Sequence, residues 1–193
     1  MRSSTITVGV CLLICLTACS ESADSADGAN RTTPTPKVAT PSPTRPTPVA
    51  PLQIGQELIW GGGGQDPASG TTVVLTYEQP VKGVTPPGEG LGVDDGVWAT
   101  VEVKVCNKQG PDISSDQQPW SLAFADGTRT QTTGLNGGDL PKPEYPTLPT
   151  VVKAGDCLRG KIPFPVSKDR RPTKIVYQAV SSTSSTEWAV PSP

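Results

Sequence analysis

The stretch VWATVEVKVC, residues 97–106, decides the fold class of this chain. Small apolar side chains occupy the odd positions from Val97 to Val105, whereas the even positions from Trp98 to Cys106 are mostly polar. Successive side chains of a β-strand point to opposite faces of a sheet. The alternation therefore predicts a strand with one face in the core and the other face toward water.

Short runs rich in Val, Thr, Ile and aromatic residues precede and follow this strand, and clusters of Gly, Pro and Asp separate them. No window has a convincing helical period, so this pattern predicts an all-β domain. Further strands are expected at residues 54–60, 71–78, 120–124, 129–133, 151–152, 157–164, 175–179 and 186–190. About seven to nine short strands favour a β-sandwich. The Gly- and Pro-rich segments 81–96 and 134–149 are expected to be irregular.

The parity of positions within these strands predicts which side chains form the core. Val73, Leu75 and Tyr77 share one face of the 71–78 strand. Aromatic side chains on inward parities are expected to be core residues, namely Trp120, Phe124, Phe164 and Tyr177.

Two of the five cysteines lie within predicted strands. Cys106 shares the outward parity of Lys104, and Cys157 shares that of Arg159. Two outward positions on neighbouring strands can be bridged, so we predict a Cys106–Cys157 disulfide on or near the surface of one sheet. A β-bulge would reverse the parity and bury the bond. Two free thiols are the other alternative.

The segment before residue 19 has the pattern of an export signal. Arg2 supplies a positive start, and the apolar run of residues 8–16 is too short for a permanent membrane span. The following Leu16-Thr17-Ala18-Cys19 resembles the bacterial lipobox. That resemblance implies cleavage after Ala18 and lipidation of the Cys19 thiol by a palmitate-type diacylglyceryl group, which would hold the protein on the extracellular face of the bacterial cell membrane. An ordinary signal peptide cut after Ala18 is the alternative.

Residues 19–51 are predicted to form a disordered tether. They are mainly Ser, Thr, Ala, Asp and Pro, and from Thr33 a proline recurs at nearly every second or third position. Such a segment cannot bury enough apolar surface to offset the entropy lost on ordering. As polyproline II helix, residues 33–51 would span roughly 60 Å. The sequence thus divides into a signal peptide (1–18), a lipidated tether (19–51) and one β-sandwich domain (52–193).

Composition excludes several classes of function. The sequence contains no histidine, so histidine-based triads and histidine metal sites are excluded. Removal of residues 1–18 would change the net charge from −2 to −3, because it removes Arg2 and no acid. A generally basic nucleic-acid-binding protein is therefore excluded. We also expect no metal and no cofactor, because the loop acids match no calcium-binding spacing and the glycines at 61–64 lack a phosphate-loop lysine.

Several short motifs of the predicted domain occur in a recognisable order. They are Ile54-Gly55-Gln56-Glu57-Leu58, a valine-rich strand ending in Asn107, Trp120-Ser121-Leu122 with Asp126-Gly127, and Val152-Lys153-Ala154-Gly155-Asp156 before a strand ending in Phe164-Pro165-Val166. Over residues 52–180 this order resembles a family of small extracellular immunoglobulin-like domains found in lipoproteins of actinobacteria and firmicutes. The family is similar in fold to a secreted mycobacterial immunoprotective antigen. The resemblance implies an immunoglobulin-like sandwich and brings no catalytic residues.

Two aromatic residues are the candidate binding residues. Trp98 has outward parity on the 97–106 strand beside a long loop, and Tyr145 lies among prolines in another loop. An exposed aromatic ring can anchor a protein partner or stack on a sugar. The alternative for Trp98 is a loop folded over the ring. A pair of loop carboxylates, Asp139 and Glu144, is the candidate acid pair of a glycoside hydrolase.

These features favour a non-catalytic binding or interaction domain displayed at the membrane by a lipid anchor. The expected partner is another envelope protein or a wall polymer. A carboxylate-based hydrolase of cell-wall glycan is one alternative, and a structural surface antigen with no dedicated ligand is another.

Overall fold

The computed structural model describes residues 49–63, 67–179 and 182–192, and in them the chain forms β-strands and a single turn of 3₁₀-helix, η1 (Glu89–Leu91). The predicted signal peptide, Cys19 and the tether up to residue 48 lie outside the described residues. The strands are β1 (Glu57–Gly61), β2 (Ser69–Glu78), β3 (Gly96–Gln109), β4 (Ile113–Ser115), β5 (Trp120–Ala123), β6 (Arg129–Gln131), β7 (Thr150–Val152), β8 (Cys157–Ser167), β9 (Lys174–Tyr177) and β10 (Thr186–Ala189). No helix in this described part has the length and apolarity needed to cross a membrane.

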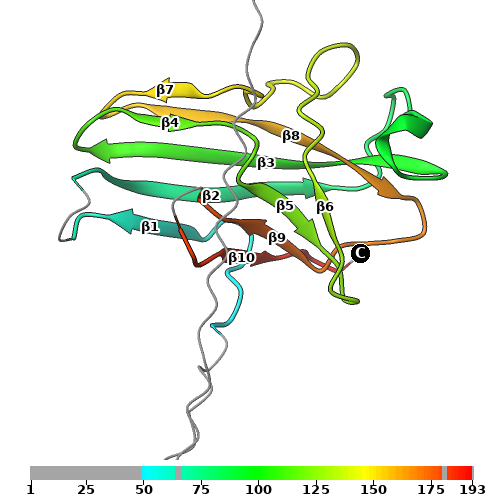
Figure 1. The fold of residues 1–193 in the computed structure, drawn as a ribbon, viewed down its shortest axis with the longest axis horizontal. Coiled ribbons are helices and arrows are strands. Elements are labelled where there is room, and N and C mark those ends of the chain that lie inside the picture. The colour runs from blue at the N-terminus through cyan, green and yellow to red at the C-terminus, as the bar shows by residue number, and fades with distance from the viewer. Residues whose placement is uncertain (1–48, 64–66, 180–181, 193) are drawn as a thin grey trace, which may run out of the picture. The chain divides into compact units, whose positions relative to one another are not determined.

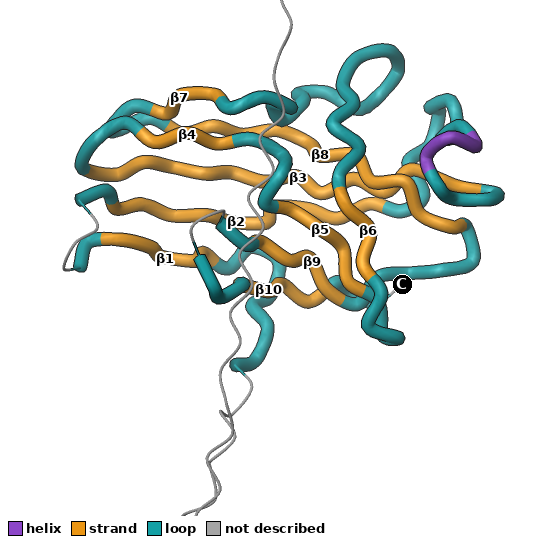
Figure 2. The backbone as a smooth tube through the Cα atoms, in the orientation of Figure 1, coloured by secondary structure: helices purple, strands orange, loops and turns teal. Residues whose placement is uncertain are grey.

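The strands form two four-stranded antiparallel sheets and a small two-stranded one (Figure 1). The first sheet has the order β1-β2-β3-β8, the second has the order β10-β9-β5-β6, and β4 pairs with β7. Strand β3 has 14 residues, whereas each strand of the second sheet has at most 4. At about 3.3 Å per residue, β3 is more than three times as long as these strands. In Figures 1 and 2 the long strands accordingly extend past β9 and β10.

The core lies between the two large sheets, and the side chains at the odd positions of β3 pack into it from the first sheet. Ala99, Val101 and Val103 have no exposed surface. The register of β3 on β8 places Phe164 beside Ala99 and Ile162 beside Val101. The second sheet contributes fully buried side chains from three of its strands, Trp120, Leu122, Ile175 and Trp188. The core face predicted for residues 97–106 is confirmed.

The other face of β3 is largely buried as well, so the predicted water-facing side is wrong. Trp98, Thr100, Glu102 and Cys106 are each less than 9 % exposed. The loop that contains Thr85 covers Trp98, and side chains of the neighbouring strands, Thr76 and Arg159, contact the Glu102 carboxylate. Alternation in the sequence identified the two faces correctly, but it carried no information about what packs on the second face.

A β-bulge changes the parity of β2. The register on β3 shifts between Val74, which pairs with Val103, and Thr76. Beyond the shift Tyr77 pairs with Val101, so Val74 and Tyr77 both face the core. The prediction that Val73, Leu75 and Tyr77 share one face is therefore wrong, because the extra residue of a bulge reverses the alternation.

Candidate functional site

Two long loops cover Trp98, one of the two candidate binding residues. Its indole Nε1 donates a hydrogen bond to the carbonyl of Thr85 (2.9 Å). Asp139, in the other long loop, accepts hydrogen bonds through Oδ2 from the backbone N–H of Thr85 (2.6 Å) and from its hydroxyl (2.8 Å). Trp98 is only 5 % exposed as a result. The structure therefore agrees with the alternative of a loop folded over the ring, and Trp98 is not available as an exposed anchor.

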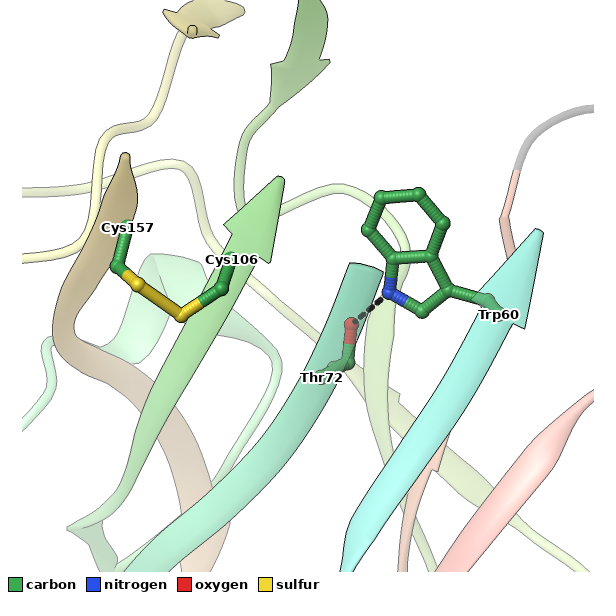
Figure 3. The surroundings of a disulfide bond; sticks show 4 residues. All are labelled: Trp60, Thr72, Cys106 and Cys157. Carbon is green, nitrogen blue, oxygen red and sulfur yellow. Dashed lines mark hydrogen bonds between the residues drawn. A yellow bond between two sulfur atoms is a disulfide. The ribbon is translucent and has the colours of Figure 1, made fainter. Parts of the chain in front are cut away.

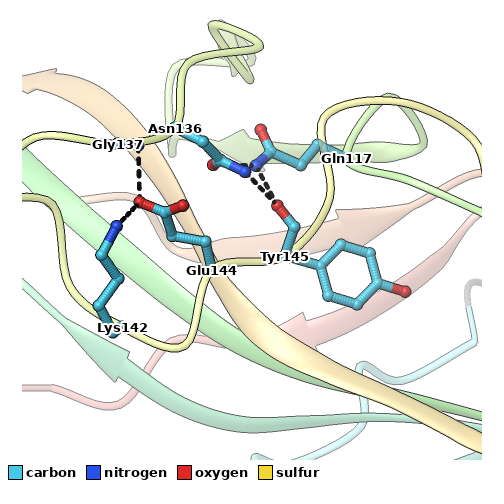
Figure 4. A network of polar contacts seen from close by, with 6 residues as sticks. All are labelled: Gln117, Asn136, Gly137, Lys142, Glu144 and Tyr145. Carbon is cyan, nitrogen blue, oxygen red and sulfur yellow. Dashed lines mark hydrogen bonds and ion pairs between the residues drawn. The ribbon is translucent and has the colours of Figure 1, made fainter.

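Tyr145, the second candidate binding residue, is completely buried. Its hydroxyl shares a hydrogen bond with Ser115 Oγ (2.7 Å). Its carbonyl accepts hydrogen bonds from Gln117 Nε2 (2.8 Å) and Asn136 Nδ2 (2.9 Å), as Figure 4 shows. Its backbone N–H donates to the carbonyl of Lys161 on β8 (3.0 Å). Tyr145 thus holds the 134–149 loop against the first sheet. The prediction of an exposed binding residue at this position is wrong.

The acid pair of the hydrolase hypothesis is engaged in structural contacts. The Glu144 carboxylate accepts hydrogen bonds from Lys142 Nζ and from the backbone N–H of Gly137 (Figure 4). The bond from Lys142 is the main cause of a lowered Glu144 pKa. Hydrogen bonds from Thr85 likewise lower the pKa of Asp139. A glycosidase general acid needs a raised pKa, so both shifts have the wrong direction for that role.

Two acids of other loops also have local partners. Asp95 pairs with Lys168 (2.7 Å), and Asp116 Oδ1 accepts a hydrogen bond from the backbone N–H of Gln118 (2.8 Å). Within residues 49–63, 67–179 and 182–192, no three or more acidic or cysteine side chains gather as metal ligands would.

The disulfide joins Cys106 and Cys157, which lie directly opposite each other on β3 and β8 (Figure 3). Cys106 is buried and Cys157 is exposed, so the bond lies at the outer surface of the first sheet. The structure agrees with the predicted pairing and with its predicted position. Farther along the same strands, Glu102 and Arg159 form an ion pair (2.8 Å) on this face.

A cavity of about 460 Å³ opens at the end of the sandwich, where the second sheet stops short of the first. Its apolar wall comes from both sheets and from β4, through Leu58, Trp60, Val105, Ile113 and Tyr177. Hydroxyl groups from β4, from the segment after β9 and from β10 also line it, including those of Ser114, Ser184 and Thr186. Sequence reasoning missed this site. The available signal was the mismatch between the long strand at 97–106 and the short predicted strands near the C-terminus.

Trp60 lies flat against the first sheet at this cavity. Its Nε1 donates a hydrogen bond to Thr72 Oγ1 on β2 (3.1 Å, Figure 3). Its ring approaches Gly70 so closely that a Cβ there would come within 2.4 Å of Trp60 Cζ2. Gly70 therefore provides the space for the indole. Because the N–H is already bonded to the sheet, the ring presents mainly carbon to the cavity.

Comparison with known proteins identifies the fold. No protein-family model and no curated protein matches the chain. Among solved structures, the chain is similar to MPT63, a secreted protein from Mycobacterium tuberculosis, with a TM-score of 0.53 and 16 % identity over 74 % of this chain and 100 % of that one. It is also similar to the YjhA protein from Bacillus subtilis, with a TM-score of 0.49 and 12 % identity over 72 % of this chain and 99 % of that one. The described domain is an immunoglobulin-like β-sandwich, as predicted.

Proposed function

We propose that this protein is a lipid-anchored bacterial surface protein that displays a non-catalytic immunoglobulin-like binding domain on a proline-rich tether. The observation that carries the proposal is the order of three sequence features, the Leu16-Thr17-Ala18-Cys19 motif, the proline-rich segment 33–51 and the β-sandwich. Two acyl chains on Cys19 would provide stable membrane attachment, whereas a single chain is marginal. The partner would be another envelope protein or a wall polymer.

The contacts of the loop acids support binding over catalysis. Asp139 and Glu144 each accept two hydrogen bonds from the protein, and their pKa values are lowered. Both carboxylates therefore stay ionised at neutral pH and organise the loops that contain them. The sequence also lacks histidine, the commonest general base of enzymes.

The decisive experiment is the intact mass of the protein extracted from membranes, measured with and without reduction and alkylation. We expect a chain that begins at Cys19 and carries a diacylglyceryl mass, with Cys106 and Cys157 alkylated only after reduction. A Cys19→Ser variant should lose the lipid mass and leave the membrane fraction. An unlipidated wild-type chain would contradict the anchor.

A second assay tests the absence of catalysis. The purified protein should not hydrolyse cell-wall glycan at an enzymatic rate. Turnover that is abolished by Glu144→Gln or Asp139→Asn would contradict the proposal and favour the hydrolase.

A further inference from the structure

The cavity at the end of the sandwich follows from the unequal lengths of the two sheets. Strands β2 and β3 continue well beyond the four-residue strands β9 and β10 (Figure 1). Inner-face side chains in this extension, such as Val105, have no strand of the second sheet above them. Residues 113–115 and the described residues Ser182 and Ser184 line the space instead and leave it open to solvent on one side. A hollow of this origin is part of the architecture and does not depend on one side-chain rotamer.

The chemistry of the wall selects for a neutral ligand. Among the described residues that line the cavity, every side chain is apolar, aromatic or hydroxyl-bearing, and none is charged. Tyr177 is the ionisable group of this wall, and burial raises the pKa of its phenol above the ordinary value, so the phenol is neutral at physiological pH. A charged ligand entering the cavity would lose hydration, and no described residue of the lining supplies an opposite charge, so its entry is unfavourable.

The distribution of apolar and hydroxyl groups indicates an amphipathic ligand. Leu58, Trp60 and Ile113 present hydrocarbon surface, whereas Ser182, Ser184 and Thr186 are hydroxyl-bearing residues of the lining. The Ser184 hydroxyl shares one hydrogen bond with Ser182 Oγ (3.1 Å), and as both a donor and an acceptor it can make a further one to a ligand. Ligand pockets are typically about 300–1,000 Å³, and polar groups in them orient the ligand. The present volume of about 460 Å³ lies within that range. The lining of this cavity is about equally polar and apolar, as an amphipathic ligand requires.

A second hollow lies next to the cavity. It has a volume of about 630 Å³ and shares Leu58 and Thr186 with the cavity as walls. Its two charged residues, Lys174 and Glu187, form an ion pair with each other (2.7 Å), so each charge is already balanced within the protein.

We propose that the cavity binds a neutral molecule with a hydrocarbon chain and a terminal hydroxyl, of the class of long-chain alcohols. This inference rests on the proposed function in one respect, since it assumes that the domain binds a ligand without transforming it. It is independent of the lipid anchor on Cys19.

The test uses the chain from residue 19 onward with Cys19→Ser, so that no lipid is attached and both sheets, the core and the disulfide are retained. The neutral fluorophore N-phenyl-1-naphthylamine is titrated into this protein. We expect a saturable rise in fluorescence with one site per chain, and displacement by 1-dodecanol at least tenfold stronger than by dodecanoate or dodecylammonium. Absence of saturable binding, or displacement by the charged compounds as strong as by the alcohol, would overturn the proposal.

Two pairs of adjacent substitutions locate the site. Ala179→Phe fills the cavity, whereas Gln178→Phe adds the same ring at the exposed neighbouring position. Leu58→Asp places a charge in the wall, whereas Ile59→Asp places it on the opposite face of β1, where Ile59 is 78 % exposed. The first member of each pair should weaken binding at least tenfold and the second less than twofold. Equal effects within both pairs would refute the location.

Circular dichroism of each variant checks folding, and the comparison of alcohol with charged analogues on the wild-type protein needs no variant. The result of the titration can be distinguished from the result of the mass measurement that tests the lipid anchor. An unlipidated chain in the mass experiment would refute the anchor and leave the titration unaffected, and a failed titration would leave the anchor unaffected.

Discussion

The buried hydroxyl pair of Tyr145 and Ser115 illustrates, at the scale of single residues, how the domain satisfies polar groups in its interior. The two oxygens lie 2.7 Å apart, and both side chains are buried. Removal of one partner leaves the other hydroxyl without its hydrogen bond, which costs more than removal of both. The pair therefore fixes the 134–149 loop in one conformation.

Tyr145→Phe should lower the free energy of unfolding by about 1–2 kcal/mol, because Ser115 would keep a buried hydroxyl without this partner. Ser115→Ala should have a similar effect. The double variant should lose about 1 kcal/mol less than the sum of the single losses, because the two residues are coupled. Urea unfolding of the four proteins measures this coupling, and strictly additive losses would contradict the interaction.

Glu144 should make stability depend on pH in the acid range. The hydrogen bonds from Lys142 and Gly137 lower its pKa below the ordinary 4.5. The folded protein therefore binds this proton less readily than the unfolded chain does, so the carboxylate stabilises the fold above the ordinary pKa. This contribution is lost as the pH falls from about 4.5 through the lowered value.

Urea midpoints of the wild type and of Glu144→Gln, measured from neutral pH down to about pH 2.5, test this expectation. The wild type should lose stability over the acid part of this range more steeply than the variant. Lys142→Gln should give an intermediate profile, because the bond from Gly137 remains. Parallel profiles for the wild type and Glu144→Gln would show that Glu144 makes no such contribution.

At the scale of whole elements, Gly160 determines how closely the 134–149 loop approaches β8. A Cβ at this position would lie 2.5 Å from the backbone N of Tyr145 and 2.6 Å from the carbonyl carbon of Glu144. These are backbone atoms, so they cannot move aside as a flexible side chain would. The backbone N–H of Tyr145, which lies in this loop, donates a hydrogen bond to the carbonyl of Lys161 on β8.

Gly160→Ala should therefore push the loop away from β8 and lower the free energy of unfolding by about 1–3 kcal/mol. The Tyr145 amide should exchange with solvent faster than in the wild type. Gly90→Ala is the matched control, since a Cβ at Gly90 meets no atom within 4 Å, and it should change stability by less than about 0.5 kcal/mol. An unchanged exchange rate in Gly160→Ala would contradict the close contact.

Strands were more predictable from the sequence than loops and surfaces, for a physical reason. The alternation at residues 97–106 reflects local backbone geometry, and it correctly identified the core face of β3. The bulge at Leu75 has no local signal, because an extra residue in a strand looks like any other residue. The exposure of Trp98 and Tyr145 could not be predicted because their burial depends on loops that are distant in sequence, such as the contact of Asp139 with Thr85.

Strand β4 and the cavity were missed for the same reason. A three-residue strand such as β4 (Ile113–Ser115) has too few positions to establish alternation. The cavity is a property of two sheets of unequal length, and a strand prediction does not place one sheet over the other. Prediction of the candidate site thus required knowledge of the tertiary arrangement, whereas the fold class could be predicted from the local pattern of apolar residues.

At the scale of the whole molecule, the disulfide closes the part of the chain that contains β5 and β6 of the second sheet and both strands of the small sheet. Cys106 and Cys157 are 51 residues apart, and β4, β5, β6 and β7 lie between them. A cross-link that closes a loop of this length restricts the unfolded chain and contributes about 4 kcal/mol in the chain-entropy treatment. Small domains have a total stability of about 5–15 kcal/mol. The bond would therefore supply a large share of the stability.

The double variant Cys106→Ala/Cys157→Ala should unfold at a much lower urea concentration than the wild type, with a loss of up to about 4 kcal/mol. The wild type treated with a thiol reductant should approach the same midpoint, because Cys157 is an exposed residue at the surface of the sheet. The double variant should itself be insensitive to reductant, which separates loss of the bond from other effects of the reagent. Since the cross-link acts mainly on the unfolded chain, circular dichroism of the double variant without urea should match the wild type. Equal midpoints for the wild type and the double variant would show that the core alone determines stability.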